Sequence, residues 1–118
     1  MDEAGKAYDV FLEGIAVPLL RQAALVLNAN GNSFSVHTPA GSARLVSDAS
    51  GQTFVEFTLD TTGPMSQVIG RVSQTRGRQA LVVEERPVAA GKAVAALTEE
   101  DVSAFLVSEI PKLVLRPS

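Results

Sequence analysis

Apolar side chains recur at helical spacing over the first part of the chain, from about Tyr8 to Asn28. Two adjacent rows of such positions make a wide stripe: Phe11, Ile15, Leu19, Ala23 and Val26 or Leu27, with Tyr8, Leu12, Ala16, Leu20 and Ala24 beside them. A stripe of this width predicts one helix that faces a broad core. Pro18 lies inside the pattern and predicts a kink near Gly14–Pro18 or two successive helices. Asn30-Gly31 predicts the end of the helix.

The middle of the chain changes from helical spacing to alternation. Five segments are predicted as strands: 33–38, 43–47, 53–60, 66–75 and 79–86. Short separators rich in Gly, Pro, Asp and Ser divide them. Parallel pairing needs crossovers of about a dozen residues or more, so these short separators predict an antiparallel meander.

Two features inside the predicted strands carry more specific expectations. Gly70 lies in the middle of the fourth strand, where glycine marks a bulge or a close approach by a helix. The fifth strand is apolar at three consecutive positions, Leu81, Val82 and Val83. Such a strand is typical of a covered or central position in a sheet, or of one that meets a partner.

A second helix is predicted near the C-terminus. Thr98 is its expected N-cap, with Asp101 at the third helical position and Leu97 and Val102 as a hydrophobic staple. Pro111 is expected to end or kink this helix, and the connector 87–97 is compatible with either a loop or a short helix. The fold prediction is a single α+β domain over residues 1–118, with both helices packed on one face of the five-stranded sheet.

The predicted order of elements is similar to that of small α+β chaperones such as the type III secretion chaperones. Those proteins usually place a helix within the sheet, and this chain shows none there. The resemblance is therefore one of architecture, carried by no motif, and a shared architecture does not define a function.

Composition excludes several classes of function. The 118 residues contain no cysteine and a single histidine, His37, so thiolate chemistry and multi-histidine metal sites are not expected. A net charge of −3 argues against nucleic-acid binding. Glu13 and Arg21 interrupt the most apolar stretch, so we expect no membrane span and a cytoplasmic protein. The common nucleotide-binding loops and the nucleophile elbow are absent from the sequence, and no cofactor is expected.

Charged residues on the predicted strands form the candidate polar site. Glu56 is expected opposite Arg71, and Arg44 and Glu84 would extend them to an alternating row; Asp60 and His37 complete the set. Two carboxylates can perform acid–base chemistry when burial separates their pKa values. Cross-strand ion pairing explains the same residues more simply, and we favour it. No catalytic residue is assigned.

Surplus apolar surface suggests an interface. The residues concerned are Leu81 and Val83 of the fifth strand and Leu113, Val114 and Leu115 of the C-terminal tail. The tail is equally compatible with docking on its own core. The favoured hypothesis is a non-enzymatic, chaperone- or adaptor-like module that forms a homodimer and binds another protein or peptide. The alternative is a small-molecule site, or a small enzyme, with polar groups between the sheet and the helices.

Overall fold

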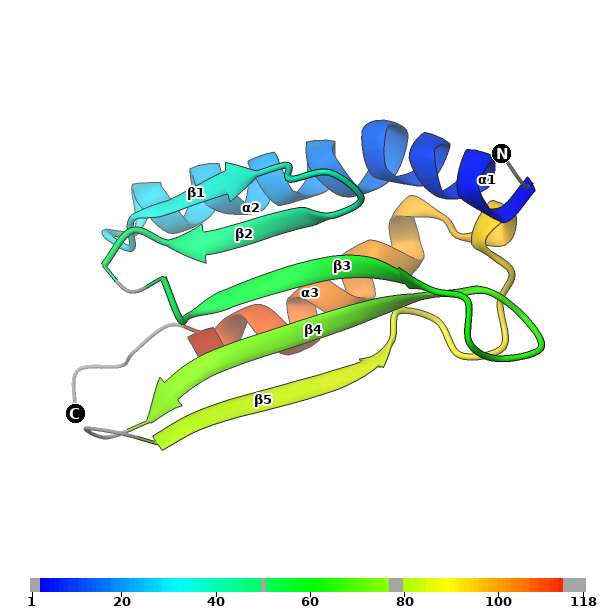
Figure 1. The fold of residues 1–118 in the computed structure, drawn as a ribbon. Helices are drawn as coiled ribbons and strands as arrows, with labels where there is room; N and C mark the ends of the chain where they lie inside the picture. Colours follow the sequence, from blue (N-terminus) through cyan, green and yellow to red (C-terminus); the bar gives the residue numbers. More distant parts are fainter. Residues whose placement is uncertain (1–2, 50, 77–79, 114–118) are drawn as a thin grey trace.

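The computed structural model describes residues 3–49, 51–76 and 80–113, and it confirms the α+β prediction (Figure 1). One long helical segment comes first, followed by five strands and a C-terminal helix. The bounds are α1 Glu3–Phe11, η1 Leu12–Ala16, α2 Val17–Ala29, β1 Phe34–His37, β2 Ala43–Ser47, β3 Phe54–Asp60, β4 Gln67–Arg76, β5 Ala80–Pro87, η2 Val94–Ala96 and α3 Glu99–Leu113.

The N-terminal helix is continuous, but its middle turn is π-helical over Leu12–Ala16. Pro18 lies in the first turn of α2, where its missing N–H and its ring disturb the preceding turn, and the wider π turn absorbs that disturbance. The helix ends as predicted. Gly31 has a φ of 85°, and the N–H of Asn32 donates to the carbonyl oxygen of Leu27 at 2.9 Å, which closes a Schellman cap.

The five strands form an antiparallel meander in the order β1-β2-β3-β4-β5. Every predicted strand is present, and no strand begins or ends more than one residue from its predicted bound. β5 lies at one edge of the sheet, so its apolar run does not mark a central strand. The short connections between consecutive strands explain this strand order, because a chain without crossovers places each strand beside the previous one.

The helices cover one face of the sheet and leave the other face open (Figure 1). In Figure 1 the long helix runs along the top of the view, partly behind β1, and α3 lies behind β3 and β4. Phe11, Phe57 and Phe105 are among the largest fully buried side chains, and their rings contact one another in sequence. This aromatic column joins α1, β3 and α3, and it fixes where both helices sit on the sheet.

Gly70 lets α3 approach the sheet closely. A Cβ atom at this position would lie 2.2 Å from the Cζ of Phe105. The prediction of a helix close to Gly70 is therefore confirmed, because any side chain would displace the Phe105 ring. The guanidinium of Arg86 lies 4.3 Å from the centre of the same ring, on the neighbouring strand.

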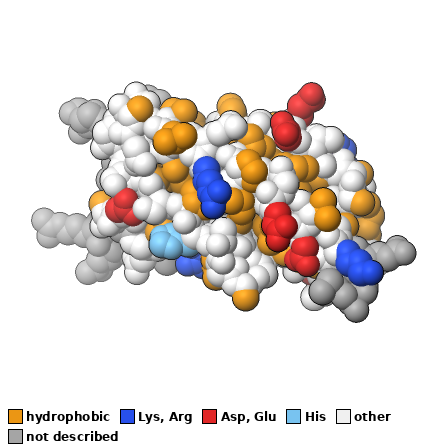
Figure 2. Space-filling model, turned by 90° about the horizontal axis from the view of Figure 1, so that it is seen from above, with side chains coloured by type: hydrophobic (Ala, Val, Ile, Leu, Met, Phe, Trp, Pro, Cys, Tyr) orange, Lys and Arg blue, Asp and Glu red, His pale blue; other side chains and the backbone are white. Residues whose placement is uncertain are grey.

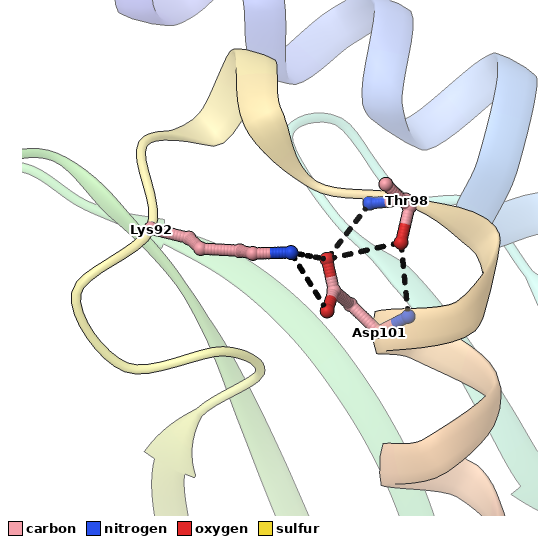
Figure 3. Close-up of polar contacts among 3 residues, drawn as sticks. All are labelled: Lys92, Thr98 and Asp101. Atoms are coloured by element: carbon pink, nitrogen blue, oxygen red, sulfur yellow. Dashed lines mark hydrogen bonds and ion pairs between the residues drawn. The ribbon is translucent and has the colours of Figure 1, made fainter.

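The start of α3 shows the predicted capping arrangement (Figure 3). The N–H of Asp101 donates to Oγ1 of Thr98 at 3.2 Å, and the N–H of Thr98 donates to Oδ2 of Asp101 at 2.9 Å. Lys92, from the connector, donates to the same carboxylate at 2.8 Å. Hydrogen bonds from Lys92 and from the Thr98 backbone lower the pKa of Asp101. Pro111 does not end α3, which continues to Leu113.

The segment Gly5–Ala29 is long and apolar enough to cross a membrane when judged by length and composition alone. This differs from the sequence-based expectation, which treated Glu13 and Arg21 as interruptions. Core helices of water-soluble proteins and signal sequences meet the same criterion. In the structure, one side of the segment packs against the sheet through Tyr8, Leu20 and Leu27, which are buried.

Candidate interaction surfaces

A row of charged side chains crosses the open face of the sheet. Arg44 lies opposite Glu56, and Glu56 lies opposite Arg71, as predicted. Nη2 and Nε of Arg44 donate to Oε2 of Glu56 at 2.7 and 3.1 Å. Glu56 is 7% exposed, and the Arg44 guanidinium also lies 4.6 Å from the centre of the Phe54 ring. The Arg44 guanidinium is thus held by the Glu56 carboxylate and by the Phe54 ring, as expected for a structural ion pair.

The prediction that Glu84 extends this row is wrong. The residue opposite Arg71 is Glu85, and Glu84 lies opposite Val72, whose side chain is buried on the helix-covered face. Neighbouring residues of a strand point to opposite faces, so a shift of one position moves a side chain across the sheet. The alternating row is Arg44–Glu56–Arg71–Glu85.

The remaining predicted polar residues have separate places. His37 is exposed at the end of β1, opposite Arg44, and so lies at the β1 end of the row. Asp60 is at the end of β3 and accepts hydrogen bonds from the Thr62 hydroxyl at 2.6 Å and the Thr62 N–H at 2.9 Å. These bonds lower the pKa of Asp60 and assign it to the turn that follows β3. Asp60 does not join the row.

The arrangement of the row differs from that of a catalytic or metal site. It lies on the face away from the helices, so it does not converge on a space between helix and sheet. Both hydrogen bonds that Arg44 donates go to Oε2 of Glu56, so this carboxylate is already engaged in the ion pair. Within the described parts of the chain, no three acidic or histidine side chains come together to hold a metal ion.

Sequence analysis missed a second ion pair, which joins β5 to α3. Nη2 of Arg86 donates to Oε2 of Glu109 at 2.9 Å, and Glu109 is only 3% exposed. The available signal was the position of Glu109, four residues after Phe105 on the buried stripe of the helix. A carboxylate there needs a cation from the sheet, and Arg86 supplies it beside Gly70.

A side chain of α2 blocks part of the β1 edge of the sheet. The N–H of Phe34 donates to Oδ1 of Asn28 at 2.8 Å, and Nδ2 of Asn28 donates to the carbonyl oxygen of Phe34 at 3.3 Å. One amide side chain thus satisfies both outward-facing backbone groups of Phe34. β1 has four residues, and Pro39 follows shortly after it. A short, blocked strand offers little to an additional strand.

The β5 edge has a different character. The N–H of Val88 donates to the carbonyl oxygen of Val68 at 3.0 Å. Hydrogen-bonded and non-hydrogen-bonded pairs alternate in an antiparallel ladder, so the pairs at Val83 and Glu85 are of the second kind. Their backbone N–H and C=O groups point away from β4. Pro87, two positions after Glu85, also faces away from β4. Its lack of an N–H therefore costs the sheet no hydrogen bond.

The predicted interface residues divide between surface and core. Val83 is 40% exposed on β5. Leu113 is 5% exposed and belongs to the hydrophobic core, in line with the alternative that the start of the tail docks on its own chain. Leu81 belongs to β5 by its pairing with Thr75. Val114 and Leu115 lie outside the described residues.

A groove with an uncharged lining runs between α2 and α3 on the side away from the sheet, with a volume of about 340 Å³. Its rims carry Val26 and Val107, which are 62% and 75% exposed. Figure 2, which looks down on the molecule from above, shows that hydrophobic side chains are also exposed on that side, with charged side chains at separate points between them. Exposed apolar surface that borders a groove is typical of a contact site.

The chain was compared with models of known families, with curated proteins and with solved structures. No family model, curated protein or solved structure matches it.

Proposed function

We propose that the protein is a non-enzymatic protein-interaction module that works as a homodimer, joined along β5 into a continuous sheet. The observation that carries this proposal is the contrast in backbone availability between the two sheet edges. β5 has eight residues, and Val83 and Glu85 direct N–H and C=O groups outward, where no strand of the described part of the chain pairs with them. An exposed edge of this kind pairs readily with another strand.

The charges along β5 favour a second copy in one register. A two-fold axis through Val83 places Glu84 opposite Val82 and Arg86 opposite Ala80 of the other copy. Glu85 then lies opposite position 81, so no two like charges face each other across the junction. An axis through Glu84 would place this carboxylate opposite itself. The first register forms about six backbone hydrogen bonds, two for each hydrogen-bonded pair.

The test is the solution mass, measured by light scattering over a concentration series. We expect the wild-type mass to rise from 12.4 kDa toward twice that value. Val83→Lys should remain at the monomer mass, because a lysine on an edge strand opposes strand addition. His37→Lys is the matched control, since His37 is exposed on the opposite edge strand.

Amide hydrogen exchange supplies an independent measurement. In the dimer, the N–H groups of Val83 and Glu85 should become protected as concentration rises, whereas that of Val36 should not. A wild-type protein that stays monomeric at all concentrations contradicts the proposal. Equal dimerisation of the wild type and Val83→Lys also contradicts it, because the junction would then lie elsewhere.

A further inference from the structure

We infer that the α2–α3 groove binds one face of an amphipathic helix, supplied by a partner protein and carrying basic residues at one end. The groove lies on the helix side of the molecule, whereas the proposed dimer junction lies at the β5 edge. The two sites therefore differ in residues and in chemistry. Failure of one leaves the other intact.

The lining of the groove selects an apolar occupant. Ten residues form it, and none of them is charged: Leu19, Gln22, Ala23, Val26, Leu27, Ser103, Leu106, Val107, Ile110 and Pro111. Polar side chains are limited to Gln22 and Ser103. Burial of a charged group here would lack any compensating partner. Aliphatic side chains, in contrast, can pack between Val26 and Val107, with the small side chains of Ala23 and Ser103 leaving room beneath them.

The same lining favours a helix over an extended segment. An extended peptide requires hydrogen-bond partners for its own backbone, and this groove offers only the two polar side chains. A helix satisfies its backbone internally and presents apolar side chains at intervals of three and four residues. The α2 side of the groove extends from Leu19 to Leu27, which corresponds to just over two helical turns or about 12 Å.

Two carboxylates near one end of the groove favour one orientation of the bound helix. Glu99 and Glu100 are exposed in the first turn of α3. They precede Ser103 by four and three residues, so they lie on the same side of the helix as the groove lining. Neither forms an ion pair among the described residues. We therefore expect lysine or arginine on the part of the bound helix that lies near this end.

The first probe is a fluorescein-labelled amphipathic peptide of about 18 residues, with leucines on one face and lysines on the other. Its binding is followed by fluorescence anisotropy. Two further peptides act as references: a scrambled sequence of the same composition without an apolar face, and a version with glutamate in place of lysine. Only the first peptide should bind tightly, and added salt should weaken its binding.

Protein variants then locate the site. Val107→Glu should weaken binding by about tenfold or more, because it places a charge at the rim of an uncharged groove. Leu25→Glu is the matched control, since Leu25 lies on the same helical segment as Val26 and is 71% exposed, but does not line the groove. Glu99→Lys combined with Glu100→Lys should weaken binding by a smaller factor and reduce its salt dependence.

The Val83→Lys variant should bind the peptide as well as the wild type does, because it alters only the β5 edge. Absence of binding by the leucine–lysine peptide overturns the inference, as does equal weakening by Leu25→Glu and Val107→Glu. A wild-type dimer that Val107→Glu dissociates and Val83→Lys leaves intact would also overturn it. In that case, a second copy of the chain would occupy the groove.

Discussion

The two edge strands of the sheet, β1 and β5, differ in what happens to their outward-facing backbone groups. At β1, the Asn28 amide holds both outward backbone groups of Phe34, and the strand has only four residues. At β5, the strand has eight residues, and charged side chains are confined to its second half. An edge that is short and blocked terminates a sheet, whereas a long edge with free backbone groups can extend it. This contrast is the basis of the proposal that the chain self-associates along β5.

The largest effect is expected from proline substitutions in β5, which test which of its N–H groups bond to β4 and which face outward. Glu84→Pro removes an N–H that the ladder assigns to Val72, and should reduce the free energy of unfolding by about 2–3 kcal/mol. Glu85→Pro removes an outward-facing N–H and should change this free energy by less than about 1 kcal/mol. Urea denaturation of both variants measures the difference. Equal losses would contradict the assignment of inward and outward groups.

Glu85→Pro has a second expected consequence. Because it deletes a donor at the proposed junction, it should reduce dimerisation while leaving the monomer folded. Light scattering and circular dichroism on the same samples separate these effects. A folded Glu85→Pro protein that dimerises like the wild type would place the junction away from this part of β5.

A smaller effect is expected at the other edge. Asn28→Ala removes both hydrogen bonds to Phe34, and should reduce the free energy of unfolding by about 1–2 kcal/mol. It should also speed hydrogen exchange at the Phe34 amide. Asn32→Ala is the control, because its amide donates only to the exposed carbonyl of Asn30, at 3.4 Å. If both variants behave alike, the Asn28 side chain does not guard the edge.

The smallest expected effect is a pH dependence at β1. Hydrogen bonds from the Ser33 and Ser35 hydroxyls lower the pKa of Asp48 below its ordinary value of 3.8. A lowered pKa in the folded state means that these contacts stabilise the protein above the ordinary value and are lost as pH falls through the lower one. Below about pH 4, the protection factors of amides near Ser33 and Ser35 should therefore fall before those of β3.

The control for this titration is Asp48→Asn, which has no carboxyl group to protonate at the same place. After correction for the intrinsic pH dependence of exchange, its protection factors near Ser33 should not change between pH 5 and pH 3. The Asp48 carboxyl signal in the wild type should titrate below the ordinary range. A normal titration of Asp48 would contradict the assigned hydrogen bonds.

Several features were predictable because their causes are local. Alternation and short turns predicted the strands, since both depend on neighbouring residues. The Thr98–Asp101 cap follows from two residues three positions apart. Gly70 was predicted to mark either a bulge or a close approach, because glycine inside a strand has few other uses. Its contact with Phe105, 35 positions later in the chain, required the structure.

The site residues were less predictable because they depend on register and on packing between distant segments. The sequence placed Glu56 opposite Arg71 correctly, yet chose Glu84 in place of Glu85 at the next strand. An error of one residue in register transfers a side chain to the other face. The Arg86–Glu109 pair joins residues 23 positions apart, and no local pattern links them.

The sequence by itself determined the type and order of the elements, because propensity, periodicity and capping act over a few residues. Only the tertiary structure decided that Asn28 blocks part of the β1 edge, that no described strand pairs with the outer edge of β5, and that α2 and α3 leave an uncharged groove between them. Each of these depends on how separate elements pack, and packing distances are fixed by the buried Phe11, Phe57 and Phe105 rather than by any single segment.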